Sequence, residues 1–206
     1  MCYNAEISLR TFIYGCISAI IVYYLGVVPP KTILILMSIT FIQFIEFLTW
    51  TYYDNLTINK YLSILAFLTI VIQLILLNYL LPDKKASKIL LLSLFIFAIL
   101  FITFQLRFVD FRMRIGKNKH LSWYWLELPL IWIIIGLAFY LIPTYLSKYK
   151  STFIFTVTLL SVSLYYHWKY KTWGSMWCYF SNIGWLYLLG LSIITLIKPY
   201  LFYRQV

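Results

Sequence analysis

Long apolar runs, separated by short polar or proline-containing segments, fill almost the whole sequence. Each run has about the 17–25 residues that an α-helix needs to cross the hydrocarbon core of a bilayer. None alternates between apolar and polar residues, as the strands of a membrane β-barrel do. The sequence therefore predicts an all-α protein, a single transmembrane bundle over residues 1–206. Its seven predicted helices cover residues 9–28, 32–52, 61–81, 88–106, 126–146, 152–168 and 178–199.

The composition favours an integral, multi-pass membrane protein. Of the 206 residues, 63% are hydrophobic and only 11% are charged, and the mean hydropathy is +0.87. A soluble domain is about half apolar and about a quarter charged. Seven spans use about 140 residues, which leaves short connections and no room for a soluble domain.

Seven passes divide the connecting segments between two membrane faces. The N-terminus and residues 53–60, 107–125 and 169–177 belong to one face, called here the Trp-rich face; the remaining segments form the opposite face. The Trp-rich face carries nine Lys and Arg residues and the opposite face eight, which together make the 17 of the chain. Because an excess of these residues marks the cytoplasmic side, this balance leaves the orientation open. The net charge of +11 favours contact with the lipid bilayer, and no nucleic-acid-binding motif accompanies it.

Tryptophan gives the first face its name. Six of the eight tryptophans lie at or beyond the helix ends there, namely Trp50, Trp123, Trp125, Trp168, Trp173 and Trp177. An interfacial belt of tryptophan normally occurs at both membrane surfaces. The one-sided set therefore predicts a structured cap or the wall of a pocket.

Glu46 is the main candidate functional residue. It lies inside the second predicted span, about six residues or 9 Å from the Trp-rich end. An ionisable group at that depth costs about 2.5–3.5 kcal/mol, so we expect it to face the bundle interior or water. Gln43, Glu46 and Trp50 share one helix face, which places Gln43 within hydrogen-bonding reach and Trp50 above the carboxyl group. The alternative is a protonated acid that only joins neighbouring helices.

The segment from Arg107 to Arg114 is interpreted as a continuation of the fourth helix, in which Asp110 pairs with Arg107 and Arg114. A charged interfacial helix end is one interpretation. The other is a clamp for an anion or a lipid headgroup, formed by Arg107, Arg112 and Arg114.

Metal and catalytic sites have little support in the sequence. His120, His167 and Glu127 are residue types that bind zinc, and all three belong to the Trp-rich face. Their spacing matches no metal-binding motif, since the histidines are not four residues apart and His-Glu-x-x-His does not occur. We therefore expect no metal, no cofactor and no catalytic residue, and an enzyme is the less favoured class.

Two further features concern the orientation. Cys2 and Cys178 both belong to the Trp-rich face and are candidates for a disulfide, which requires a lumenal or extracellular location. Asn55-Leu56-Thr57 is a glycosylation sequon on the same face. Both features favour an N-terminus outside the cytosol.

Three short motifs resemble a family of small, uncharacterised multi-pass membrane proteins encoded by large nucleocytoplasmic (giant) DNA viruses. The motifs are the opening Met1–Ser8, the stretch Gln43–Trp50 and the stretch Gly174–Cys178. Such proteins often begin Met-Cys-Trp-Asn, and here Tyr3 replaces the tryptophan. The resemblance implies a seven-helix fold in a host endomembrane or a virion inner membrane, and it implies no established activity.

Together these features predict a polar, tryptophan-walled pocket that opens on the Trp-rich face, with Glu46 at its floor. Its predicted lining is Gln43, Glu46, Trp50, Glu6, Asn4, Ser175 and Trp177. We expect such a pocket to bind or transport a small ligand, a proton or a cation through Glu46. Two alternatives stay open: a structural or assembly protein of a viral inner membrane, and a membrane-embedded hydrolase that uses Glu46 or Glu127 with a histidine.

Overall fold

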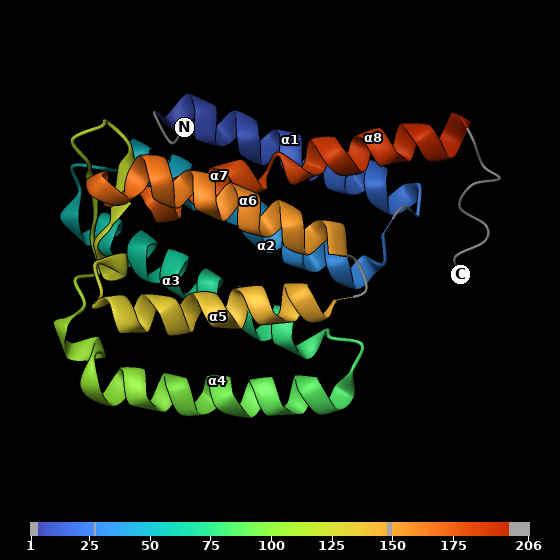
Figure 1. The fold of residues 1–206 in the computed structure, drawn as a ribbon. Coiled ribbons are helices and arrows are strands. Elements are labelled where there is room, and N and C mark those ends of the chain that lie inside the picture. Colours follow the sequence, from blue (N-terminus) through green and yellow to red (C-terminus); the bar gives the residue numbers. More distant parts are fainter. Residues whose placement is uncertain (1–3, 27, 148–149, 198–206) are drawn as a thin grey trace.

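The computed structural model describes residues 4–26, 28–147 and 150–197. Within these ranges the chain forms eight α-helices and one short β-hairpin, and the helices lie side by side along a common direction (Figure 1). The helices are α1 (Ala5–Tyr24), α2 (Pro30–Thr51), α3 (Leu56–Tyr79), α4 (Lys84–Phe104), α5 (Leu130–Leu146), α6 (Lys150–His167), α7 (Trp173–Ser181) and α8 (Gly184–Ile197).

Three of the helices begin four or five residues earlier than the apolar runs predict, because a polar side chain caps each of them. The Asn4 side chain accepts a hydrogen bond of 2.9 Å from the Ile7 backbone N–H at the start of α1. Asn55 caps α3 and Asp83 caps α4 in the same way. Such caps satisfy backbone N–H groups that have no partner within the helix, so the polar first turn becomes helical as well.

Five helical stretches are long and apolar enough to cross a membrane, which confirms the membrane class: Ala5–Tyr24, Pro30–Thr51, Leu56–Tyr79, Lys84–Phe104 and Trp173–Ile194. The helix α5 is apolar but has only 17 residues, and α6 is not among the five. Large apolar side chains such as Leu92, Phe95 and Ile102 are more than half exposed on α4. A surface of this kind suits lipid rather than water.

The connection between α4 and α5 differs from the predicted helix extension. After α4 ends at Phe104 and a 3₁₀ turn covers Leu106–Phe108, strand β1 (Met113–Ile115) pairs antiparallel with β2 (Leu121–Trp123). The prediction that the fourth helix continues through residue 114 is therefore wrong. Between residues 109 and 113 apolar and charged residues alternate, and this period of two suits a strand rather than a helix.

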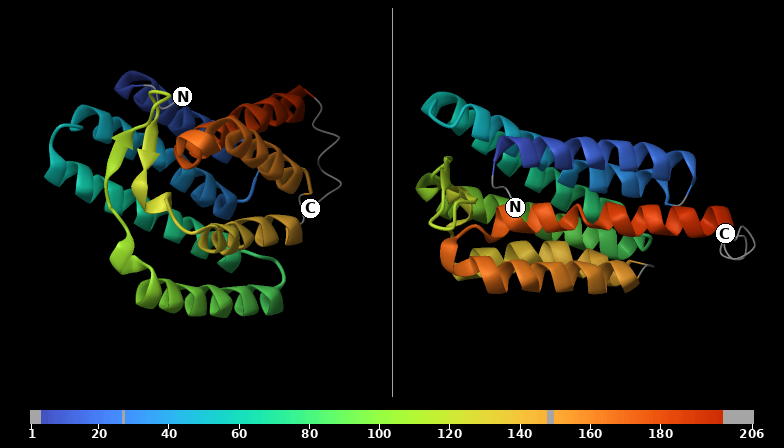
Figure 2. Two further views of the ribbon diagram at one scale, coloured as in Figure 1. Left: turned by 60° about the vertical axis from the view of Figure 1, so that its left-hand side comes forward. Right: turned by 90° about the horizontal axis from the view of Figure 1, so that it is seen from above.

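The hairpin lies across the ends of the helices and closes the Trp-rich face (Figure 2). Its apolar side chains belong to the same core as those of the helix interior. Buried members of this core include Ile42 and Ile45 of α2, Leu62 and Ala66 of α3, Met113, Leu121 and Trp123 of the hairpin, and Trp173 and Trp177 of α7. The predicted cap of tryptophans on this face is thereby confirmed.

The last membrane-length stretch is interrupted between α7 and α8. Thr40 of α2 donates a hydrogen bond of 3.0 Å to Asn182 Oδ1, and Trp185 Nε1 donates one of 2.9 Å to Thr40 Oγ1. Asn182 Nδ2 in turn donates to the Cys178 carbonyl, at 2.8 Å. Polar side chains thus satisfy the backbone at a helix break inside the apolar core, as a membrane interior requires.

Candidate functional site

Glu46 lies in the interior of the bundle, on the side of α2 that faces α7. The side chains of Glu46 and Gln43 are fully buried. Gln43 Nε2 donates a hydrogen bond of 3.0 Å to Glu46 Oε2, so the hydrogen bond predicted between these residues is confirmed. Cys178 of α7 is buried as well and lies within electrostatic range of the Glu46 carboxyl group.

A second set of polar contacts joins α2, α3 and α5 in the same interior. The Tyr140 hydroxyl of α5 donates to Gln73 Oε1 of α3 at 3.4 Å, and Gln73 Nε2 donates to the Ser38 carbonyl of α2 at 3.0 Å. The Trp177 ring meets the Tyr140 ring edge-on, with centroids 5.7 Å apart. Among the buried residues of the described chain, Glu46 is the only Asp, Glu, Lys or Arg.

The hairpin covers Glu46 from the Trp-rich face. Thr49, one helical turn further along α2, contacts the Met113 sulfur of β1 at 3.4 Å. Asn59 of α3 holds the same residue, since its Nδ2 donates to the Met113 carbonyl at 3.1 Å and its Oδ1 accepts from the Met113 N–H at 2.9 Å. Trp123 and Trp125 stack above this contact with centroids 5.1 Å apart, and each is only 2% exposed.

Some of the predicted pocket residues do not lie near Glu46. Asn4 caps α1 with its side chain, and the exposed Glu6 forms an ion pair of 2.5 Å with Arg10 on the outer surface of the same helix. Both residues are thus engaged within their own first turn, so the predicted lining by Asn4 and Glu6 is wrong. Helix capping and local ion pairing explain this placement, because both residues stand in the first turn of a helix.

The remaining predicted lining residues are packed into the covered interior. Ser175 and Trp177 of α7 are buried, and Trp50 is half-buried with its ring stacked on Tyr53. Gly174 lies directly under the hairpin, where a Cβ atom would collide with the Leu126 side chain and lie 3.3 Å from the Trp123 ring. The glycine of the Gly174–Cys178 motif therefore permits the close approach of α7 to the cap.

The three arginines of the predicted clamp do not converge. Arg112 forms a two-pronged contact with Asp110, at 2.7 Å from Nε and 2.6 Å from Nη2, and Arg114 lies 3.6 Å from the same carboxylate. The hydrogen bond from Arg112 lowers the pKa of the Asp110 carboxyl group. Arg107 instead lies over the Phe108 ring, 4.7 Å from its centroid. The pairing predicted between Asp110 and Arg107 is wrong, because no helix continues through this segment.

The two histidines lie together, but the predicted carboxylate is engaged elsewhere. The His120 and His167 rings meet edge-on with centroids 5.4 Å apart, and Asn118 Nδ2 lies 3.3 Å from His167 Nδ1. Glu127 forms an ion pair with Lys171. Within the described ranges no group of three or more His, Cys, Asp or Glu side chains is placed to hold a metal ion.

Cys178 has a free thiol, and its predicted partner Cys2 lies outside the described residues. The sequon residue Asn55 is exposed at the start of α3. The disulfide and the orientation therefore stay predictions.

Two cavities open at the Trp-rich end, and Glu46 lines neither of them. The larger, of about 380 Å³, lies between the hairpin and the turn from α6 to α7 and is bordered by Lys117, Lys169 and Lys171. The smaller, of about 340 Å³, lies between β1 and the turn from α2 to α3 and includes Arg112. These lysines were missed by the sequence argument because the two segments that carry them are about 50 residues apart and share no motif.

The chain matches no known family model, no curated protein and no solved structure.

Proposed function

We propose that this protein is a seven-pass membrane protein that takes up and releases a proton at Glu46, beneath the cap of tryptophans. The observation that carries the proposal is a fully buried carboxyl group whose Oε2 accepts a hydrogen bond from the Gln43 amide. Within the described residues, no other Asp, Glu, Lys or Arg is buried. Transfer of a charged carboxylate into such an interior is expensive, which favours the protonated acid at rest.

A proton suits this site better than a metal cation or a larger ligand. Hard cations require about six or more oxygen ligands, usually including several carboxylates. The described hydrogen bond to Glu46 comes from the Gln43 amide, and no other carboxyl group is buried within the described residues. A proton needs only one acceptor and a hydrogen-bonded partner for the charged form, which Gln43 provides.

Seven passes follow if α5 and α6 cross the membrane together with the five longer stretches. This interpretation is supported by the lengths of α5 and α6, 17 and 18 residues, and by their place alongside the longer helices (Figure 1). The chain ends agree with it, since α1 begins at the capped end of the bundle and α8 ends at the other. An odd number of passes places the two ends on opposite sides. We further propose a host endomembrane or virion inner membrane as its location, with the capped end lumenal, from the motif resemblance and the Asn55 sequon.

A structural or assembly role is the second candidate, and the packing of the cap favours it. Met113, Trp123 and Trp125 are each 2% exposed and belong to the same buried core as Ile42 and Ile45 of α2. In this case the acid only joins helices through the Gln43 contact. No described contact favours a hydrolase, because Glu127 pairs with Lys171 and the two histidines contact each other at the cap.

The test is infrared difference spectroscopy of the full chain in nanodiscs over a range of pH. We expect a protonated-carboxyl band that changes with pH in the wild type and is absent from Glu46→Gln. The same variant in vesicles should lose pH-driven proton flux, because an amide keeps the hydrogen bond but cannot release a proton. Glu6→Gln is the matched control, since this carboxyl group is exposed on α1.

A protonated band that is the same at every pH, together with equal proton flux in wild type and Glu46→Gln, would support the structural role instead. Helicity measured by circular dichroism should be unchanged in both variants. This measurement separates loss of the proton site from loss of the fold.

A further inference from the structure

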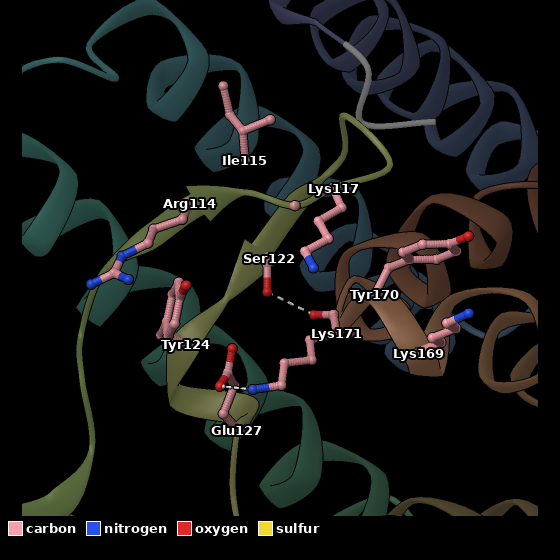
Figure 3. Close-up of a pocket in the computed structure, with 10 residues that line it drawn as sticks. Arg114, Ile115, Lys117, Ser122, Tyr124, Glu127, Lys169, Tyr170 and Lys171 are labelled. Carbon is pink, nitrogen blue, oxygen red and sulfur yellow. Dashed lines mark hydrogen bonds and ion pairs between the residues drawn. The ribbon is translucent and has the colours of Figure 1, made fainter.

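The larger cavity at the Trp-rich end is bordered mainly by cationic and aromatic side chains from two distant segments (Figure 3). One wall is the hairpin, with Lys117 in its turn and Ser122 on β2; the other is the turn between α6 and α7, with Lys169 and Lys171. Its volume of about 380 Å³ falls in the range of small-ligand pockets. Tyr124 lies at its edge, and the guanidinium carbon of Arg114 lies 4.0 Å from the centroid of the Tyr124 ring.

The two walls are fixed to each other by hydrogen bonds. Ser122 Oγ donates to the Lys171 carbonyl at 2.8 Å, and Asn118 Nδ2 donates to Thr172 Oγ1 at 2.9 Å. Lys171 has a left-handed backbone, with φ of 57°, that turns the chain between these two contacts. Because both walls are held by a buried cap, the cavity is preformed. The free-energy cost of ordering it when a ligand binds is therefore small.

The charges around this cavity are unequal. Four cationic side chains border it, from Arg114, Lys117, Lys169 and Lys171, against the single carboxylate of Glu127. That carboxylate pairs with the Lys171 ammonium, and the Lys117 side chain extends into the space above this pair (Figure 3).

We infer that this cavity binds a phosphate-bearing anion, with Lys117 and Lys171 as its main contacts. The excess of positive charge and the preformed walls are the features that such a group requires. The cavity lies at the end of the helices, where lipid headgroups are found, so the phosphate comes either from an anionic lipid or from a soluble phosphate ester. This site is separate from Glu46 and does not depend on the proposed proton function.

The test measures lipid and phosphate binding by the full chain in nanodiscs. Native mass spectrometry detects lipid that stays bound in phosphatidylcholine discs with or without phosphatidic acid, and calorimetry detects inorganic phosphate in discs of phosphatidylcholine alone. Retained phosphatidic acid identifies a headgroup site, and bound inorganic phosphate identifies a site for soluble phosphate. Either result supports the inference, and binding of neither overturns it.

Three variants distinguish a built site from general surface charge. Lys117→Gln should weaken binding about fivefold, since one cation near a membrane surface contributes about 1 kcal/mol. Glu127→Gln should strengthen binding by a similar factor, because it removes the carboxylate that competes for Lys171. Lys60→Gln, an exposed cation on the same face outside the cavity, should leave binding unchanged. Equal weakening by the Lys117 and Lys60 changes, or no gain from the Glu127 change, would contradict a specific site.

Discussion

The chain reverses direction at both ends of the helix bundle, but different kinds of hydrogen bond hold the turns at each end. At the opposite face the turn from α3 to α4 is held by local hydrogen bonds: Asp83 caps α4 through the N–H groups of Lys85 and Ala86, and Lys84 donates to the Leu81 carbonyl three residues before it. At the Trp-rich face the bonds join distant segments, such as Asn59 with Met113, 54 residues apart.

This difference shows that the Trp-rich end depends on more specific contacts than the opposite end. A short turn needs only residues that cap a helix or bend the backbone, as Gly26 does with its φ of 63°. A cap that crosses the bundle must satisfy buried polar groups from several helices at once, and each of them is costly if left unpaired. Charge alone does not distinguish the ends, since they carry nearly equal numbers of Lys and Arg. The candidate sites at Glu46 and at the larger cavity, called here the basic cavity, both depend on the cap.

The largest effect on the cap is expected from removing the hydrogen bonds between α3 and the hairpin. Asn59→Leu leaves the N–H and the carbonyl of Met113 without their partner inside the cap. We expect the hairpin to lose about 2–4 kcal/mol of local stability, because each buried group left unpaired costs about 1–3 kcal/mol. Hydrogen exchange measured by mass spectrometry in nanodiscs should show faster exchange across residues 109–125.

The matched control is Asn55→Ala, four residues earlier in the same chain segment. Asn55 is exposed and only caps α3, so its loss should cost about 1 kcal/mol and leave hairpin exchange unchanged. Equal protection of the hairpin in Asn59→Leu and the wild type would mean that the apolar contacts alone hold the cap in place.

A smaller effect is expected from crowding the contact between α7 and the cap. Gly174→Val inserts side-chain atoms where even a Cβ would displace Leu126 and press on Trp123. Overpacking of this kind costs about 1–3 kcal/mol, and it should lower the thermal unfolding temperature in detergent. Gly136→Val is the comparison, because no atom lies within 4 Å of a Cβ at Gly136. A similar loss in both variants would assign the effect to helix propensity rather than to the cap.

The opposite face and the helices could largely be predicted from the sequence, and the cap only in outline. Apolar runs located the helices, but they placed the starts of α3 and α4 at residues 61 and 88. The caps Asn55 and Asp83, which act through neighbouring residues, set these starts at residues 56 and 84. The one-sided tryptophans predicted a cap, and the Gln43–Glu46 spacing predicted their hydrogen bond.

Local sequence patterns could not predict which residues line the basic cavity or that the cap covers Glu46. Lys117 and Lys171 approach each other only because Ser122 and Asn118 bridge two segments about 50 residues apart. The alternation in residues 109–113 was the available signal for β1, and the charge pairing expected at helical spacing obscured it. Local patterns cannot specify which distant segment a short hairpin will cover.

The smallest expected effect concerns the pH dependence of the cap. His120 is buried at the end of the hairpin turn, and burial, with a contribution from the nearby His167, lowers its pKa from 6.5 to about 4. The unfolded chain therefore binds a proton at His120 before the folded chain does, so stability falls as the pH falls from 6.5 toward 4. We expect about 1 kcal/mol from this residue, since solvent screens part of the shift.

His120→Gln removes the titrating group and keeps a polar side chain, so the pH dependence of hairpin exchange between pH 4 and 6.5 should become flatter than in the wild type. At pH 7.5 the two proteins should differ little, because His120 is neutral in both the folded and the unfolded chain there. Turns at the opposite face contain no histidine and should exchange independently of pH in this window once intrinsic rates are corrected. A wild-type hairpin whose protection is equally flat would show that water reaches His120 and that the cap is more open than its packing indicates.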